Sequence, residues 1–210
     1  MKKVSIIIPV YNMEDWVESG IKCITEQTYE NLEIIIVDDG SKDNSYMKCL
    51  AEADKDRRIA VFSKNNEGPG AARNLALRKA TGDYIYFFDI DDYLEKNAIE
   101  KFARYMENEN TDLVVCSFSM FDGEKVFRTV KKADGLKRTG GDARKDYYEH
   151  MFMYGERGIQ GAAWFKLYKT DIIRKNGIEF PKLRKSEDDV FVARYVNCID
   201  SFYMTGDVLC

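Results

Sequence analysis

Three carboxylates directly after an apolar run are the residues whose types and spacing most strongly suggest chemistry. The run at 84–88 is followed by Asp89, Asp91 and Asp92. Clustered carboxylates repel one another, which is costly unless a cation or a set of donors compensates their charge. A divalent metal that holds a phosphorylated ligand is the simplest compensation, and capping of the next helix is the alternative. We favour metal binding because three acids exceed what a cap needs, although Asp92 alone could serve as one.

Two further segments, Pro9–Asn12 and Asp38–Ser41, also follow apolar runs. Each has a structural interpretation as a strand terminator or turn that leads into a helix cap. For Pro9–Asn12 the structural interpretation is favoured, and the functional alternative is its place at the carboxyl edge of the sheet. For Asp38–Ser41 the functional alternative is that acidic residues after the second strand of nucleotide-binding sheets accept hydrogen bonds from the ligand, and local sequence leaves both interpretations open.

An acidic triplet near the end of the chain allows a similar choice. Ser186 and Asp189 have the spacing of a capping box, in which acids favour the helix N-terminus. Alternatively, Asp188 could act as a general base, a role that contributes about 10²–10⁴-fold in rate, but the local sequence alone favours capping. Arg73 follows a glycine-rich loop near a predicted helix start, where it could pair with a phosphate or with the acids at 89–92 or simply be solvated.

The elements that must position these residues alternate between strands and helices. We expect strands at 4–10, 32–37, 59–63 and 84–88, and helices at 14–26, 43–54, 71–80 and 94–106. This alternation predicts an α/β fold with a doubly wound, mostly parallel sheet. Because such sheets bind ligands outside the carboxyl ends of their strands, the acids are expected along one edge.

The pattern changes in the second half of the chain. Strands at 112–121 and 125–130 flank Asp122-Gly123, which is a hairpin signal. We expect a basic surface loop at 131–145, helices at 142–153 and 186–197, and a short segment at 163–168. Trp164 is expected in the core or, as the less favoured alternative, on a platform for a sugar. His150, the single histidine, is expected to be structural.

Composition limits the classes of protein that need considering. The chain has 210 residues, 45% of them hydrophobic, and a net charge of −4. It can therefore build a core, and its charge gives no reason to expect nucleic acid as a partner. Five scattered cysteines without CxxC spacing predict reduced thiols and a cytoplasmic location. No stretch is long enough to span a membrane, which leaves open peripheral attachment to its inner face through regions outside this chain.

Taken in order, the sequence blocks resemble the inverting nucleotide-sugar glycosyltransferases of family 2, which have the GT-A fold. The resemblance covers most of the chain and is specific because order and spacing match together. Its blocks are Ser5–Asn12, Glu33–Ser41, Asn66–Gly68 with Ala72–Asn74, Gly82–Asp92, Trp164–Tyr168 and Glu187–Phe191.

The resemblance implies a role for each matching residue. Pro9, Tyr11 and Asp39 match the uridine-binding set, with Asp39 facing the base, Asp38 beside it, and Arg73 steadying the nucleotide pocket. In the DxD motif, Asp91 matches the metal–diphosphate ligand and Asp89 a contact to the ribose or sugar. Asp188 matches the catalytic base, and Trp164 and Glu187 are candidate contacts to the acceptor or sugar.

The resemblance also implies an activity and an architecture. We expect a single GT-A domain over 1–210, with a Rossmann-like mostly parallel sheet and a smaller mixed subregion on the acceptor side. Residues 1–110 would bind the nucleotide sugar and 111–210 would face the acceptor, with the chain truncated at its C-terminus. The expected reaction uses Mg²⁺ or Mn²⁺ and inverts the configuration of a sugar, from UDP-sugar to a carbohydrate or lipid-linked acceptor. Surface polysaccharide or glycoconjugate synthesis is the expected setting.

Two alternatives were weighed against this expectation. Asp89 and Asp91 also mimic the nucleophile and acid of phosphatases of the haloacid dehalogenase type. That family places Gly and Thr after the second acid and the motif near the N-terminus, whereas here Asp92 and Tyr93 follow and three predicted strands come first. The second alternative is a truncated domain that binds a nucleotide without turnover. A dinucleotide oxidoreductase is disfavoured because no GxGxxG follows the first strand.

Overall fold

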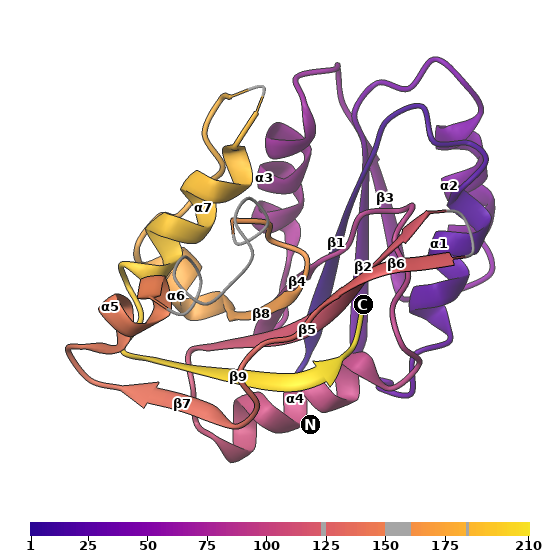
Figure 1. Ribbon diagram of the computed structural model, residues 1–210. Helices are drawn as coiled ribbons and strands as arrows, with labels where there is room; N and C mark the ends of the chain where they lie inside the picture. The colour runs from indigo at the N-terminus through magenta and orange to yellow at the C-terminus, as the bar shows by residue number, and fades with distance from the viewer. Residues whose placement is uncertain (123–124, 150–160, 184) are drawn as a thin grey trace.

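A twisted sheet runs through the centre of the computed structural model, which describes residues 1–122, 125–149, 161–183 and 185–210 (Figure 1). Its strands are β1 (Val4–Val10), β2 (Leu32–Asp38), β3 (Ile59–Ser63), β4 (Tyr84–Phe87), β5 (Leu113–Asp122), β6 (Lys125–Val130), β7 (Leu136–Thr139), β8 (Lys166–Lys169) and β9 (Ser201–Val208). The helices are α1 (Val17–Thr25), α2 (Ser45–Ala53), α3 (Pro69–Lys79), α4 (Ala98–Asn108), α5 (Ala143–Tyr148), α6 (Thr170–Lys175) and α7 (Glu187–Val196).

The N-terminal half of the sheet is parallel, in the order β3-β2-β1-β4. Its strands are continuous apolar runs, which is typical of parallel strands covered on both faces. Ile6, Ile7 and Ile8 in β1 have no exposed surface, and Phe87 at the end of β4 is 1% exposed. Helix α3 packs against β1 and β2. The predicted parallel sheet is therefore confirmed in this half.

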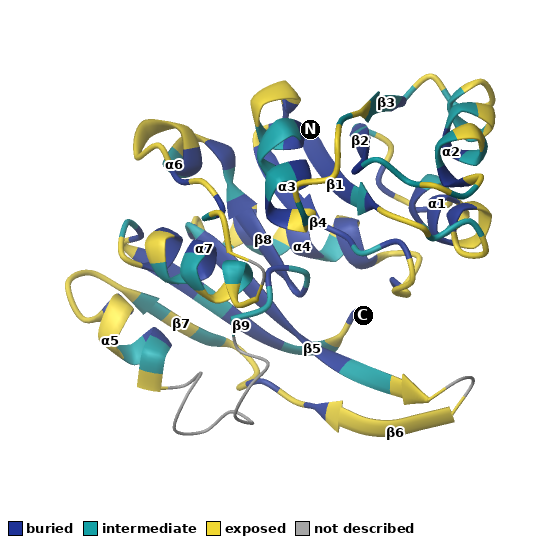
Figure 2. Ribbon diagram, turned by 90° about the horizontal axis from the view of Figure 1, so that it is seen from above, coloured by how far each residue is buried: buried dark blue, intermediate teal, exposed yellow. Residues whose placement is uncertain are grey.

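The other half of the sheet is mixed. β8 lies between β4 and β5 and is antiparallel to both, whereas β9 is parallel to β5 and antiparallel to β7. β6 pairs with β5 alone on the edge, and Figure 2 shows it reaching away from the body with its residues mostly exposed. The hairpin predicted around Asp122 is present. A mostly parallel sheet with a mixed subregion confirms the predicted α/β class.

Several elements of the second half differ from the expectation. The predicted loop at 131–145 is wrong in part, because it contains β7 and the start of α5. α6 and β9 were not predicted. The sequence of β7, Leu-Lys-Arg-Thr, has no apolar pattern that would predict a strand. It forms a strand because it pairs with β9. His150 lies outside the described residues.

Two segments that were open to a capping interpretation do not cap a helix through the side chains considered. Ser186 precedes α7 with a left-handed backbone (φ 60°) and makes no capping hydrogen bond through its side chain. Asp92 does not cap α4, since that helix begins at Ala98 with Asn97 at the cap position. Capping by the Ser186 hydroxyl and by Asp92 is therefore not seen, although Glu187, Asp188 and Asp189 do lie in the first turn of α7, where acids are favoured. In the described ranges, no helix combines the length and hydropathy needed to cross a bilayer.

Candidate active site

The carboxyl ends of β1, β2 and β4 lie side by side, because β1 pairs with both of its neighbours in parallel. Val10 is in register with Asp38, and the amide of Asp39 donates to the carbonyl of Val10 at 2.8 Å. On the other side, Ile7 is in register with Phe87 of β4. The predicted groups at Pro9–Tyr11, Asp38–Asp39 and Asp89 therefore lie at, or just after, the ends of three adjacent strands. Tyr11 is 40% exposed at this edge.

Asp38 shapes the turn after β2. Its carboxylate is buried and accepts hydrogen bonds from the backbone amides of Gly40 and Ser41 and from the hydroxyl of Ser63. Gly40 has a φ of 75°, which a glycine adopts without strain. The structural interpretation of Asp38 as a turn residue is therefore correct.

Asp39 stabilises the loop that leads into α3 through hydrogen bonds. Its buried carboxylate accepts from Lys64 Nζ at 2.8 Å and from the amides of Glu67 at 3.1 Å and Gly68 at 2.7 Å. Burial lowers the pKa of Lys64, but hydrogen bonds to Asp39 and Glu67 outweigh it, and the net shift is upward. Asp39 thus fixes where α3 begins and, through that helix, where Arg73 lies.

Arg73 joins three carboxylates from distant parts of the chain. Its guanidinium donates to Asp89 at 2.7 Å, to Asp188 at 3.0 Å and to Glu187 at 3.4 Å. The residue is 5% exposed and lies 5.5 Å from the ring centroid of Phe180. We call these four charged residues the Arg73 cluster. It contains acids from both halves of the predicted site.

Burial, followed by the charges of the Arg73 cluster, shifts the pKa of Asp188. Burial raises this pKa, Arg73 lowers it, and Asp89 and Glu187 raise it again, with a net upward shift. A carboxylate with a raised pKa that is still held by an arginine is suited to accept a proton. The second oxygen of Asp188 accepts from the backbone amide of Ala163 at 3.3 Å.

Asp91 and Asp92 lie outside the Arg73 cluster, in the turn after β4. Much of the surface of Asp92 is exposed to solvent, but its carboxyl group is surrounded by protein atoms that reduce its hydration. This desolvation and the negative charges of Asp89 and Asp91 raise the pKa of Asp92 to about 7. A cation placed beside these acids would relieve that repulsion.

The donor chemistry at this turn fits a metal that is shared with a ligand. In the described ranges no three His, Cys, Asp or Glu side chains are arranged to hold an ion between them. Mg²⁺ and similar ions are commonly bound by one or two carboxylates plus substrate phosphates. Asp91 is exposed and could supply such a carboxylate. The residues therefore fit a shared metal and not a site made of protein ligands alone.

Trp164 borders the site from the second half of the chain. It is half-buried, and its ring packs edge-on against Phe118 and Phe165, with centroids 4.9 and 5.0 Å away. These contacts agree with the expectation that Trp164 belongs to the core. Its candidate role as a sugar contact stays a prediction, as do the roles of the other site residues.

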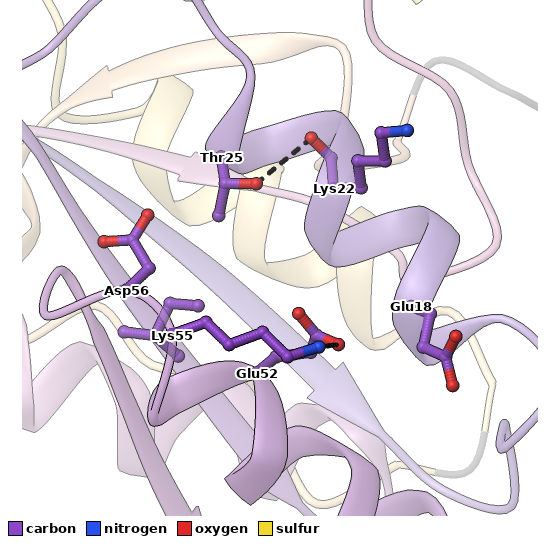
Figure 3. Close-up of a pocket in the computed structure, with 7 residues that line it drawn as sticks. Glu18, Lys22, Thr25, Glu52, Lys55 and Asp56 are labelled. Atoms are coloured by element: carbon purple, nitrogen blue, oxygen red, sulfur yellow. Dashed lines mark hydrogen bonds and ion pairs between the residues drawn. The ribbon is translucent and has the colours of Figure 1, made fainter.

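Two surface cavities flank the fold. One, of about 400 Å³, lies between α1, α2 and the start of β3 and is lined by charges of both signs, including Glu18, Lys22 and Lys55 (Figure 3). It contains none of the predicted site residues. The other, of about 430 Å³, lies between α3 and residues 179–183 and includes Lys64 and Phe180, which contact Asp39 and Arg73. This second cavity adjoins the predicted site.

Sequence reasoning missed three contributors to the site. Lys64 pairs with Asp39, the face of Phe180 covers Arg73, and the amide of Ala163 holds Asp188. No local pattern marks them, because each acts through a contact between segments that are distant in sequence. The one available signal was the position of Lys64, a cation directly before the glycine-rich loop, where it could pair with an acid such as Asp39.

Comparison with known proteins gives a consistent result. The sequence model of "Glycosyl transferase family 2" matches residues 5–176. EpsH of Bacillus subtilis, a protein assigned as a glycosyltransferase, is 34% identical over 194 residues, or 91% of this chain and 55% of its own length. A poly(ribitol-phosphate) beta-glucosyltransferase of Bacillus spizizenii is 31% identical over 90% of this chain and 28% of its own. The chain thus spans about half the length of EpsH.

Solved structures share the fold. TarS 1–349 of S. aureus in complex with UDP has a TM-score of 0.83 at 24% identity, over 99% of this chain and 59% of that one. A mannosyltransferase of Pyrobaculum calidifontis, in complex with GDP-Man and Mn²⁺, has a TM-score of 0.71 at 19% identity, over all of this chain and 56% of that one. At these identities the likeness establishes the architecture. Neither the phosphatase nor the inactive-domain alternative is favoured by these comparisons.

Proposed function

This chain belongs to glycosyl transferase family 2, and we propose that it transfers a sugar from a UDP-sugar to a hydroxyl group of an acceptor, with inversion at the anomeric carbon. UDP is chosen because the TarS structure, which shares the fold at a TM-score of 0.83, was solved with that nucleotide. The relatives extend well beyond the matched region, so the activity of the whole protein is part of the proposal.

The Arg73 cluster is the observation that carries this proposal. Its guanidinium lies 2.7 Å from Asp89, the predicted sugar or ribose contact, and 3.0 Å from Asp188, the predicted base. A donor sugar beside Asp89 would therefore lie near the group that must deprotonate the attacking hydroxyl. Such proximity is what a single in-line displacement requires.

The residues of this chain would divide the reaction between them. Pro9, Tyr11 and Asp39 would bind the uridine, and Arg73 would hold Asp89 and Asp188 in place. Asp188 would take the proton from the acceptor hydroxyl as that oxygen attacks the anomeric carbon and the bond to the diphosphate breaks. A divalent ion, Mg²⁺ or Mn²⁺, held by Asp91 would neutralise charge on the departing diphosphate.

We extend the proposal to the organisation and location of the protein. The predicted nucleotide contacts all fall in residues 1–110, and the predicted base falls in 111–210, which supports a donor-side and an acceptor-side half. The five cysteines are free, which supports a cytoplasmic location. Attachment at the inner face of the membrane, and a carbohydrate or lipid-linked acceptor in polysaccharide synthesis, complete the proposal, the latter supported by the poly(ribitol-phosphate) relative.

The test replaces Asp188 with Asn. Because the acceptor is unknown, turnover is measured as hydrolysis of a panel of UDP-sugars with Mn²⁺, and binding as titration with UDP. D188N should lose about 10²–10⁴-fold in turnover, the usual contribution of a general base, and keep its affinity for UDP. D171N, in the exposed first turn of α6, is the matched control and should retain the wild-type rate. A wild-type rate in D188N would show that Asp188 is not the base.

A further inference from the structure

The two oxygens of Asp188 are held by different partners. Oδ1 accepts from Arg73 at 3.0 Å, and Oδ2 accepts from the backbone amide of Ala163 at 3.3 Å. Ala163 is 1% exposed, so this amide is shielded from water. A carboxylate fixed at both oxygens has a defined direction for its remaining lone pairs. The segment that carries Ala163 therefore helps to aim Asp188.

Lys166 holds the same peptide group from its other side. Its Nζ donates to the carbonyl oxygen of Ala162 at 2.5 Å. The carbonyl of Ala162 and the amide of Ala163 belong to one planar peptide unit, so a donor on the oxygen polarises the N–H. The chain of contacts runs from Lys166 through this peptide to Asp188.

Further anchors press this segment against α7. The hydroxyl of Tyr168 donates to the carbonyl of Ala163 at 3.1 Å. Gly161 lies so close to α7 that an added Cβ would be 2.8 Å from the Cα of Asp189. Lys166 and Tyr168 both project from β8, which is held between β4 and β5. The peptide is thus fixed by a central strand.

Lys166 remains a donor despite its surroundings. It has no exposed surface, and its Nζ lies 3.4 Å from the centroid of the Phe165 ring. Burial lowers the pKa of Lys166, the nearby charge of Lys132 lowers it further, and Asp188 opposes them. Both the ammonium and the neutral amine carry N–H groups, so the bond to Ala162 persists in either state.

We propose that Lys166 is a positioning residue that orients the base Asp188 through the Ala162–Ala163 peptide. This inference rests on the proposed function, in which Asp188 accepts the proton. Burying the amine of Lys166 removes its hydration, which is costly unless its N–H groups are hydrogen-bonded, and one of them is bonded to the carbonyl of Ala162.

The proposal predicts a change in the pH dependence of turnover. Hydrogen bonds to a carboxylate favour its charged form, so weakening the amide of Ala163 should raise the pKa of Asp188. Since Asp188 must be ionised to act as a base, the acid limb of the rate profile should move to higher pH. The charged and titratable groups that face Asp188 from its surrounding elements are Arg73, Asp89, Glu187, Lys166 and Tyr168.

The experiment compares K166M with K132M. Lys132 is a suitable control because it is also a buried lysine, with its Nζ 5.3 Å from the centroid of the same Phe165 ring. Among the described hydrogen bonds, none joins its amine to the Ala162–Ala163 peptide. The rate of UDP-sugar hydrolysis with Mn²⁺ is measured from pH 5.5 to pH 9, together with UDP affinity. The acid limb of K166M should lie at least about half a pH unit higher than that of the wild type. At pH values on that limb, K166M should therefore lose at least about threefold more activity than it loses on the plateau at higher pH. K132M should keep the wild-type limb, and both should keep UDP affinity.

The outcomes separate this inference from the proposed function. If D188N keeps the wild-type rate in the same assay, the base assignment fails and this inference falls with it. If D188N is inactive and K166M loses activity equally at all pH values, only the positioning role of Lys166 is overturned. Y168F, which removes a second anchor of the same segment without removing a charge, is measured whether or not K166M folds, because it separates the effect of the peptide from the direct effect of the Lys166 charge on Asp188. An unmoved acid limb in Y168F would then overturn the role assigned to the peptide.

Discussion

Arg73 contacts carboxylates from two distant parts of the chain while it is itself almost fully buried. Its partners Asp89 and Asp188 are 16 and 115 positions away in the sequence. Removing one partner from a buried ion pair leaves uncompensated charge, which is more costly than the net value of the pair. The same residue therefore serves stability and the geometry of the site.

We predict that R73M destabilises the protein by about 3 kcal/mol, the usual cost of breaking a buried pair. Without Arg73 the pKa of Asp188, already raised in the fold, should rise further. An acid whose folded pKa is above its unfolded value binds protons more tightly in the folded state, so falling pH relieves the strain. The loss should accordingly be smaller at pH 5 than at pH 8.

Urea unfolding at both pH values measures this effect. R78M is the control, because Arg78 lies on the same helix, and its ion pair with Glu179 is more than half exposed on both sides. Exposed pairs contribute less than about 1 kcal/mol, so R78M should be close to wild type. Equal losses in R73M at the two pH values would contradict the electrostatic account of the Arg73 cluster.

Asp91 allows a separate test of the metal. D91N should weaken UDP binding in the presence of Mn²⁺, because the amide is a poorer ligand for a hard cation than a carboxylate. Binding measured in EDTA should be the same for wild type and D91N. Calorimetric titration with UDP gives both values. Equal affinities in Mn²⁺ would mean that Asp91 is not the metal ligand.

At the scale of elements, the contact between α7 and residues 161–163 decides where the predicted base lies. Gly161 permits this approach, since an added Cβ would be 1.5 Å from Oδ1 and 2.8 Å from Cα of Asp189. The side chain of Asp189 can rotate away, but the backbone of α7 cannot. A larger residue at 161 must therefore push the segment from the helix.

We expect G161A to lower stability by about 1–3 kcal/mol, as overpacking does, and to reduce UDP-sugar hydrolysis as the amide of Ala163 moves from Asp188. G141A is the matched control, because a Cβ at Gly141 would meet no atom within 4 Å. Thermal unfolding and turnover are measured on both variants. Full activity in a stable G161A protein would show that this close approach is dispensable.

The strands that could be predicted from sequence are those with a strong local signal. Ile6–Ile8 and Ile34–Val37 are apolar runs that become buried parallel strands, and Asp38 and Asp89 follow such runs. By contrast, β7 is a strand only because it pairs with β9, and Ser186 fails as a cap because its backbone is left-handed. Contacts between segments that are distant in sequence, such as Arg73 with Asp188, cannot be inferred from a local pattern. The sequence therefore indicated which acids belong to the site, but not which residues they contact.

At the scale of the whole molecule, ligand binding should be visible as stability. A ligand that binds only the folded state stabilises it by about 2.7 kcal/mol at one hundred times its Kd. For a chain of this size, that corresponds to a rise in Tm of about 5–10 °C. We predict such a rise with UDP and Mn²⁺ together, and a clearly smaller one with UDP in EDTA. A panel of nucleotide sugars in the same assay would rank the donors, and no shift with any of them would contradict nucleotide-sugar binding.

The place of β8 in the sheet has a consequence for biosynthesis. β4 and β5 are consecutive strands in the chain before β8, yet β8, about fifty residues further on, separates them. While the ribosome is still making residues 113–165, the outer edge of β4 has no partner strand to cover it. Because unpaired strand edges can recruit other chains, we expect folding of the nascent chain to be helped by rapid completion of synthesis or by a chaperone. Slow codons placed just before residue 166 should therefore lower the yield of folded protein.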